Sequence, residues 1–126
     1  MIAVEFPAMR KEVVGALASL ADRDYQDRAW LHQEFELEGR FEDFDLIVHI
    51  LYDDTEVLPD PLPAVGAVLF DSEVAALGTL GAALTPLISR LGDASTSEYL
   101  ESDGWSAVVD AAGVALATMV RHGNFG

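Results

Sequence analysis

The chain contains no cysteine, so disulfide bonds, thiolate catalysis and cysteine-based zinc sites are excluded. Basic residues are also scarce, because 7 lysines and arginines stand against 22 acidic residues and give a formal net charge of −15. A surface this negative repels phosphate backbones and anionic lipid, so binding to nucleic acid or to a membrane surface is disfavoured. The partners that it attracts are basic proteins and metal cations.

Long apolar runs are missing as well. No uninterrupted run approaches the roughly 20 residues of a membrane span, and the first residues lack the pattern of a signal peptide. We therefore expect a cytoplasmic protein. The length of 126 residues fits one domain, 1–126, and a hydrophobic content of 51% is enough to fill one core.

Apolar residues recur at helical spacing and predict an all-α fold, a bundle of four or five helices. The predicted helices run from about Pro7 to about Asp22, after a cap at Asp24, from about Asp43 to Tyr52, from a cap at Asp71 or Ser72 to Gly92, and from a cap at Asp103 to Gly123. A further short turn of helix is expected to begin at Thr96 or Ser97. Pro86 is expected to kink or split the fourth helix, because proline removes a backbone donor and clashes with the preceding turn.

The segment from about residue 34 to residue 58 has a second interpretation. Residues 34–38 alternate acidic and apolar side chains, which favours a short extended piece. Residues 46–52 are rich in strand formers, and residues 53–55 could turn them back onto residues 57–58 as a hairpin. Helix and hairpin both remain open for this stretch.

The middle of the chain concentrates negative charge among large apolar residues. Between residues 34 and 60 a single arginine accompanies ten acids, which are Glu34, Glu36, Glu38, Glu42, Asp43, Asp45, Asp53, Asp54, Glu56 and Asp60. A segment this apolar is expected to fold rather than to form a disordered acidic tail. The carboxylates that it leaves in water would then carry a strong negative field.

Part of this segment is similar to a calcium-binding EF-hand loop. Glu34, Glu36 and Glu38 occupy positions 1, 3 and 5, and Gly39 occupies position 6. The side-chain lengths are reversed, since the loop prefers aspartate or asparagine at the early positions and glutamate at position 12, where Asp45 stands here. A solvated amphipathic strand or turn explains the same pattern more simply.

Asp45, His49 and Asp53 are spaced four residues apart, so a helix would place them along one side. Such a carboxylate–imidazole set can contribute to a metal site, and Asp45 and His49 are its candidate ligands. The simpler interpretation is that His49 is a core residue with hydrogen-bonded ring nitrogens. No other histidine-rich helix offers further ligands, and no cofactor motif is present.

Other conspicuous residues have structural explanations. Trp30 and Trp105 are expected to anchor the core, and His32 is expected at the surface or its boundary. His122 ends the last helix, where a cation suits the helix dipole. Glycines 78, 81 and 113 are expected to mark close helix packing.

A family resemblance is carried by residues 9–20, 24–30, 45–55, 65–77 and 97–112, and most specifically by the run HILYDDT at residues 49–55. In these segments the chain resembles a small, acidic, functionally uncharacterised family of bacterial, largely actinobacterial, proteins. Some members of that family are similar to immunity proteins that neutralise toxins. The resemblance supplies no catalytic residues.

The sequence favours a binding protein over an enzyme, and we expect no cofactor. The leading hypothesis is an acidic protein-interaction module, in its most concrete form an immunity-type inhibitor that covers a basic partner such as a toxin. The expected contact residues are Glu34, Glu36, Glu38, Glu42, Asp53, Asp54 and Glu56. The alternative is a small helical metal-binding protein or metalloenzyme that uses carboxylates near His49. A solvated acidic face that only keeps the protein soluble, and a homodimer built on the fourth or the last helix, stay open as well.

Overall fold

The computed structural model describes residues 3–34 and 42–124, and all regular structure in these ranges is helical apart from one isolated bridge between Val65 and Leu69. The expected all-α bundle is confirmed. Its elements are α1 (Pro7–Leu20), α2 (Arg23–Tyr25), the π-helix η1 (Gln26–Leu31), α3 (Phe44–Val48), the π-helix η2 (His49–Asp54), the 3₁₀ turns η3 (Leu62–Ala64) and η4 (Asp71–Glu73), α4 (Val74–Leu91), α5 (Thr96–Leu100) and α6 (Trp105–His122).

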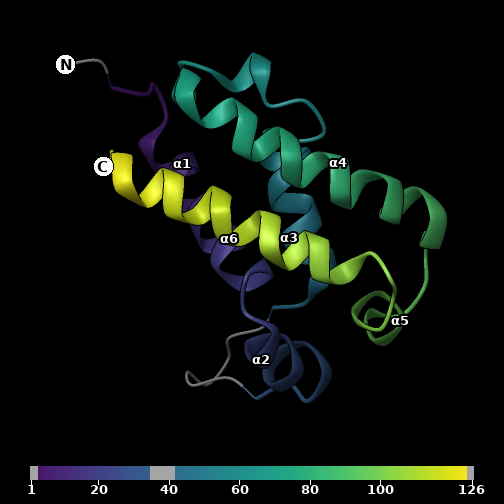
Figure 1. The fold of residues 1–126 in the computed structure, drawn as a ribbon. Helices are drawn as coiled ribbons and strands as arrows, with labels where there is room; N and C mark the ends of the chain where they lie inside the picture. Colours follow the sequence, from purple (N-terminus) through teal and green to yellow (C-terminus); the bar gives the residue numbers. More distant parts are fainter. Residues whose placement is uncertain (1–2, 35–41, 125–126) are drawn as a thin grey trace.

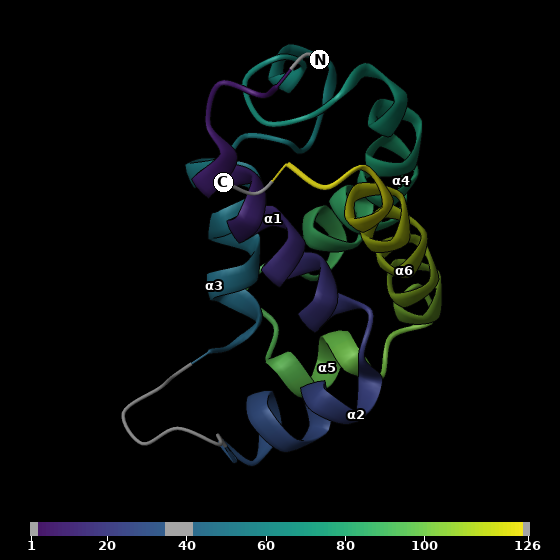
Figure 2. The ribbon, with the colours of Figure 1, turned by 90° about the vertical axis from the view of Figure 1, so that its left-hand side faces the viewer.

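The two longest helices, α4 and α6, lie side by side along one side of the molecule (Figure 1). Figure 2 shows α1 in the middle, with α6 on one side of it and α3 on the other. The short helices α2 and α5 close the end of the bundle that is lowest in Figure 2. As a result, α3 and η2 leave one long face in solvent, away from α6.

Aromatic rings fill the core at the end near α2 and α5. The ring of Phe44 lies 4.6 Å from that of Tyr99 and 5.4 Å from that of Trp105, centroid to centroid. Trp30 packs 6.0 Å from Phe44 and 6.3 Å from Trp105. The indole of Trp105 donates a 2.9 Å hydrogen bond to Oε1 of the buried Gln26. Both tryptophans are therefore the core anchors that the sequence predicted.

Helical spacing identified most of the buried residues of the long helices. In α4, Leu77, Leu80, Leu84 and Leu87 lie at helical spacing and are buried. Helical spacing in the last helix also predicts that Val120 points inward, which is wrong: Val120 is 53% exposed because it lies on the face of α6 turned away from the core.

The predicted helix caps are less accurate. The second helix is capped by Asp22 rather than Asp24, since Oδ1 of Asp22 accepts a 3.0 Å hydrogen bond from the Tyr25 amide. No side chain caps α6, so the expected cap at Asp103 is wrong. The predicted cap of the fourth helix at Asp71 or Ser72 is also wrong, because both residues lie in the turn η4 and neither side chain caps the start of α4.

The hairpin alternative for residues 46–58 is wrong, because α3 continues directly into η2 as one helical segment. Asp43 starts it by accepting a 2.9 Å hydrogen bond from the Leu46 amide. A split of the fourth helix is wrong too. Pro86 lies on the exposed side of α4, which continues to Leu91.

Glycines end both long helices as expected, with φ of +52° at Gly92 and +69° at Gly123. Close packing is confirmed only at Gly81, where an added Cβ would lie 3.0 Å from the backbone oxygen of Pro59. At Gly78 and Gly113 an added Cβ would meet no atom within 4 Å, so the packing prediction is wrong there.

Among the described residues, the stretch Asp71–Leu91 is long and apolar enough to cross a membrane by length and composition alone, with a mean hydropathy of 1.4. The same test is passed by core helices of soluble proteins. Here Glu73 at the start of the stretch is fully buried against Arg10, and four leucines of α4 pack in the core. Inside the bundle, 28% of the most apolar window of this stretch is buried.

Candidate functional site

The face that α3 and η2 leave in solvent carries much of the acidic segment. Asp45 stands in the first turn of α3, and Asp53 and Asp54 end η2. All three are exposed, as are Glu56 and Asp60 in the connection that follows. One continuous helical segment thus presents carboxylates from both of its ends to water.

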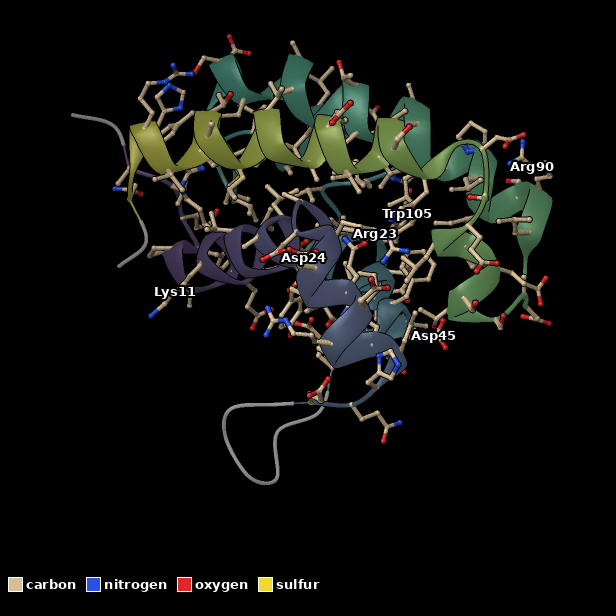
Figure 3. All side chains as sticks on the ribbon, turned by 60° about the horizontal axis from the view of Figure 1, so that its bottom comes forward. Lys11, Arg23, Asp24, Asp45, Arg90 and Trp105 are labelled. Carbon is tan, nitrogen blue, oxygen red and sulfur yellow. The ribbon has the colours of Figure 1, made fainter. Side chains whose placement is uncertain are left out.

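These carboxylates have few counter-ions. In the part of the chain that the structure describes, no lysine or arginine forms an ion pair with any of them, because the arginine pairs there are Arg10–Glu73 and Arg23–Asp27. Figure 3 shows Lys11 and Arg90 at opposite ends of the molecule, each well away from Asp45. The negative charge of this face is therefore left largely uncompensated within the described residues.

Two further features extend the face. Leu46, next to Asp45, is 39% exposed and gives the face an apolar spot. Asp45 also lies beside α5 (Figure 3). Burial raises the pKa of Tyr99 in α5, and the negative charges of Asp45 and Asp93 raise it further. The field of the face thus reaches the α5 end of the bundle.

Not every predicted contact residue is free to meet a partner. The carboxylate of Glu42 is half-buried and accepts hydrogen bonds from Ser19 Oγ at 3.1 Å and from Trp30 Nε1 at 2.9 Å. This residue fastens the start of α3 to α1 and η1. Glu34 is exposed. Glu36 and Glu38, and with them most of the EF-hand-like loop and the expected extended piece, lie outside the described residues.

The histidine at this face is not the core residue that the sequence suggested. His49 is 66% exposed, and its Nδ1 lies 2.6 Å from Oδ2 of Asp53, which is 63% exposed. Among residues 3–34 and 42–124, no group of three or more metal-ligating side chains converges. His49 and Asp53 alone therefore fall short of a metal site, and Asp45 does not complete one.

A second cluster, which the sequence analysis did not predict, lies at the opposite end of α1. Arg10 and Glu73 are both 0% exposed and form a bidentate pair, with Nη1 and Nη2 each 2.6 Å from one carboxylate oxygen. A usable signal existed: Arg10 stands three and seven residues before Val13 and Leu17, on the apolar side of the first helix.

Arg10 joins four segments of the chain. Besides Glu73, it donates to the backbone oxygens of Val68 at 3.1 Å, Met119 at 3.3 Å and Gly123 at 2.7 Å, which uses its five N–H groups. Its guanidinium carbon also lies 4.6 Å from the centre of the Phe70 ring. A positive charge at the carboxyl end of α6 is favoured by the helix dipole.

Glu73 is saturated with donors. It accepts from Arg10, from the Phe70 amide at 2.9 Å and from Nδ1 of His122 at 2.8 Å. Burial on its own would raise the pKa of this carboxyl, but the hydrogen bonds from Arg10, Phe70 and His122, with the charge of Arg10, outweigh it and hold the pKa below its usual value. Glu73 is therefore ionised at neutral pH.

Comparison with known protein families places the chain. Residues 4–124 match the family described as Domain of unknown function (DUF7945). The chain belongs to this family. The match covers the whole helical bundle, including the acidic face of α3–η2 and the buried Arg10–Glu73 pair. Comparison with curated proteins and with solved structures gives no significant match.

Proposed function

We propose that this member of the family is an acidic protein-binding module that docks a basic partner on the exposed face of α3 and η2. The observation that carries the proposal is that Asp45, Asp53 and Asp54 are exposed on one helical segment with no lysine or arginine partner among the described residues. Uncompensated charge of one sign on one face steers an oppositely charged protein and speeds its association.

An interface also needs a group that is removed from water. Leu46 supplies an exposed apolar side chain beside Asp45. Apolar anchors surrounded by polar residues contribute most of the binding energy at many interfaces, whereas charges at the rim act mainly on the association rate. The module would therefore use Leu46 for affinity and the carboxylates for the rate and choice of partner.

The most concrete form of this proposal is an immunity-type inhibitor in the bacterial cytoplasm, which covers the basic active site of a toxin. It is supported by the sequence resemblance through the run at residues 49–55, of which residues 49–54 form η2. Glu34 and the acids at positions 36 and 38 would add to the contact. Glu42 would contribute indirectly, by fixing the start of α3 through Ser19 and Trp30.

The proposal is tested by pull-down from the parent lysate with two variants of equal charge. Asp53→Asn, Asp54→Asn and Glu56→Gln together remove three charges from the face. Glu101→Gln, Asp103→Asn and Asp110→Asn remove three exposed charges that follow α5 or lie within α6, outside α3 and η2. Both triple variants change the formal net charge from −15 to −12.

We expect wild type and the α6 variant to capture the same basic protein at low salt, and the face variant to lose it. The captured partner is then purified and its association rate with wild type measured against salt, where a steep decrease is expected. If both triple variants lost the partner equally, binding would depend on the net charge of the protein and not on this face. Failure to capture any basic protein at low or high salt would count against docking altogether.

A further inference from the structure

A cavity of about 590 Å³ opens beside the buried Arg10–Glu73 pair. Its walls are the segment at Ala3 and Val4, the connection over residues 65–72 and the end of α6 at His122. Hydrogen bonds hold this wall together, from the amides of residues 5 and 6 to the backbone oxygens of Gly66 and Ala67 at 2.9 and 2.8 Å. Small-molecule sites commonly have volumes of about 300–1,000 Å³, so the cavity has the size of such a site.

The hydrogen bonds of Glu73 fix the chemistry of His122. An ionised carboxylate only accepts hydrogen bonds, so the 2.8 Å contact requires that His122 Nδ1 is the donor. In the neutral ring the other nitrogen, Nε2, then carries a lone pair. Within the described residues Nε2 has no hydrogen-bond partner, and His122 lines the cavity.

The orientation of this ring is also fixed from its side. His122 packs edge-on against Phe70, with the ring centres 6.0 Å apart and the planes at 86°. Phe70 is held in turn by the hydrogen bond that its backbone amide donates to Oε1 of Glu73 and by the guanidinium of Arg10. The imidazole is therefore positioned before any ligand arrives, which lowers the cost of binding.

The remaining lining decides what kind of molecule fits. Most of it is apolar, with Val4, Val65 and Leu69 as the aliphatic part, and its polar side chains besides His122 are Ser72 and the carboxylate of Asp71. Among the described residues that line it, none is a lysine or an arginine. An anionic ligand would meet a carboxylate, an imidazole lone pair and a protein of net charge −15. A neutral or cationic ligand meets no such repulsion.

We propose that this cavity binds a small apolar molecule that carries a hydroxyl or ammonium group, with this group donating a hydrogen bond to Nε2 of His122. The apolar part of the ligand lies against Val4, Leu69 and Phe70. Asp71 at the edge of the cavity favours the ammonium form of the donor over a neutral hydroxyl. The site is separate from the acidic face of α3 and η2, and the two can be tested independently.

The test uses three probes with the same apolar body, namely 2-phenylethanol, 2-phenylethylamine and phenylacetate. Each is titrated into the full ¹⁵N-labelled chain at about pH 8. We expect the alcohol and the amine to shift the amide signals of residues 65–72 and the Nε2 signal of His122. We expect phenylacetate to bind at least about tenfold more weakly, the effect of one unfavourable charged contact.

Three variants complete the test. His122→Phe keeps an aromatic ring but removes the acceptor, and it should weaken the alcohol and the amine by about threefold to tenfold, the value of one hydrogen bond. Val65→Phe should fill the cavity and abolish binding of both. Val114→Phe, on an exposed position of α6 outside the cavity, is the matched control and should bind like wild type.

The proposal is overturned if none of the probes binds at about 10 mM, the affinity range of fragments this small. It is equally overturned if phenylacetate binds as well as the others, since the donor would then be irrelevant. If His122→Phe bound the alcohol and the amine as tightly as wild type, Nε2 of His122 would not be the acceptor and the proposal would fail. Because Val65→Phe leaves the Arg10–Glu73 pair intact, it decides the location of binding even if His122→Phe fails to fold.

Discussion

Replacing Arg10 with methionine tests how strongly the buried ion pair supports the fold. The substitution keeps an unbranched apolar chain in the core but removes the charge and the five hydrogen bonds of Arg10. Glu73 is left fully buried without its charged partner. Removing one partner of a buried pair costs about 3–5 kcal/mol, because the remaining charge is neither paired nor hydrated.

For a chain of 126 residues this is a large fraction of the stability. An unfolding entropy of about 2.1 cal/mol/K per residue gives about 0.26 kcal/mol/K for the chain, so the expected decrease in Tm is about 12–19 °C. Circular dichroism during heating and in urea measures it. Arg90→Met, at an exposed position of α4, is the matched control and should stay within about 0.5 kcal/mol of wild type.

The double variant Arg10→Met, Glu73→Met separates pairing from packing. An apolar pair of similar volume has no uncompensated charge, so the double variant should be more stable than Arg10→Met alone. The reasoning would be refuted if Arg10→Met lost less than about 1 kcal/mol, or if the two substitutions were additive. Either result would mean that Glu73 finds enough other donors from Phe70 and His122.

Three further outcomes are expected. Because the folded-state pKa of Glu73 is lowered, the ionised carboxylate should contribute its full stability above about pH 4.3, and this contribution should be lost as the pH falls through the folded pKa. In urea titrations at acid pH, the difference in unfolding free energy between wild type and Glu73→Gln should therefore shrink. A difference that stays constant with pH would contradict this prediction. Asp45→Asn should lower the pKa of Tyr99, because one of the two negative charges that raise this pKa is gone. Tyrosinate absorbance during a pH titration measures the change, and an unchanged titration would mean that the charge of Asp45 does not affect the pKa of Tyr99. Gly81→Ala should destabilise the fold by about 1–3 kcal/mol, because the added Cβ would lie 3.0 Å from the backbone oxygen of Pro59. Gly78→Ala should stabilise it by about 0.5–1 kcal/mol, because the space around Gly78 is open and alanine favours the helix. Similar urea midpoints for the two variants would refute the packing argument.

The long helices could be predicted from the sequence, because apolar residues recur at helical spacing along them. The repeated leucines of α4 and the glycines that end α4 and α6 fix the main helices, because burial of one face and a left-handed end residue are local requirements. Caps were less predictable, since Asp22 and Asp24 are chemically equivalent and only the path of the chain between α1 and α2 selects Asp22. The hairpin alternative arose because residues 46–52 suit strand and helix alike.

The acidic face was predictable from composition, but the roles of single carboxylates were not. Glu42 was expected at the surface, yet the indole of Trp30 and the hydroxyl of Ser19 engage it, and both come from elements distant along the chain. The same limit explains why the partnership of Arg10, Glu73 and His122 was missed. Their positions are 63 and 49 residues apart, and no local pattern connects them.

The backbone acceptors of Arg10 have a consequence for the order of folding. The oxygen of Gly123 is separated from Arg10 by 113 positions in the chain, and that of Met119 by 109. During synthesis the guanidinium of Arg10 must stay hydrated until Met119 and Gly123 have emerged. Closing so long a loop slows folding, and the cooperative gain arrives only when α6 is complete. Chains released before that helix is finished would keep the guanidinium in water and remain open to proteolysis.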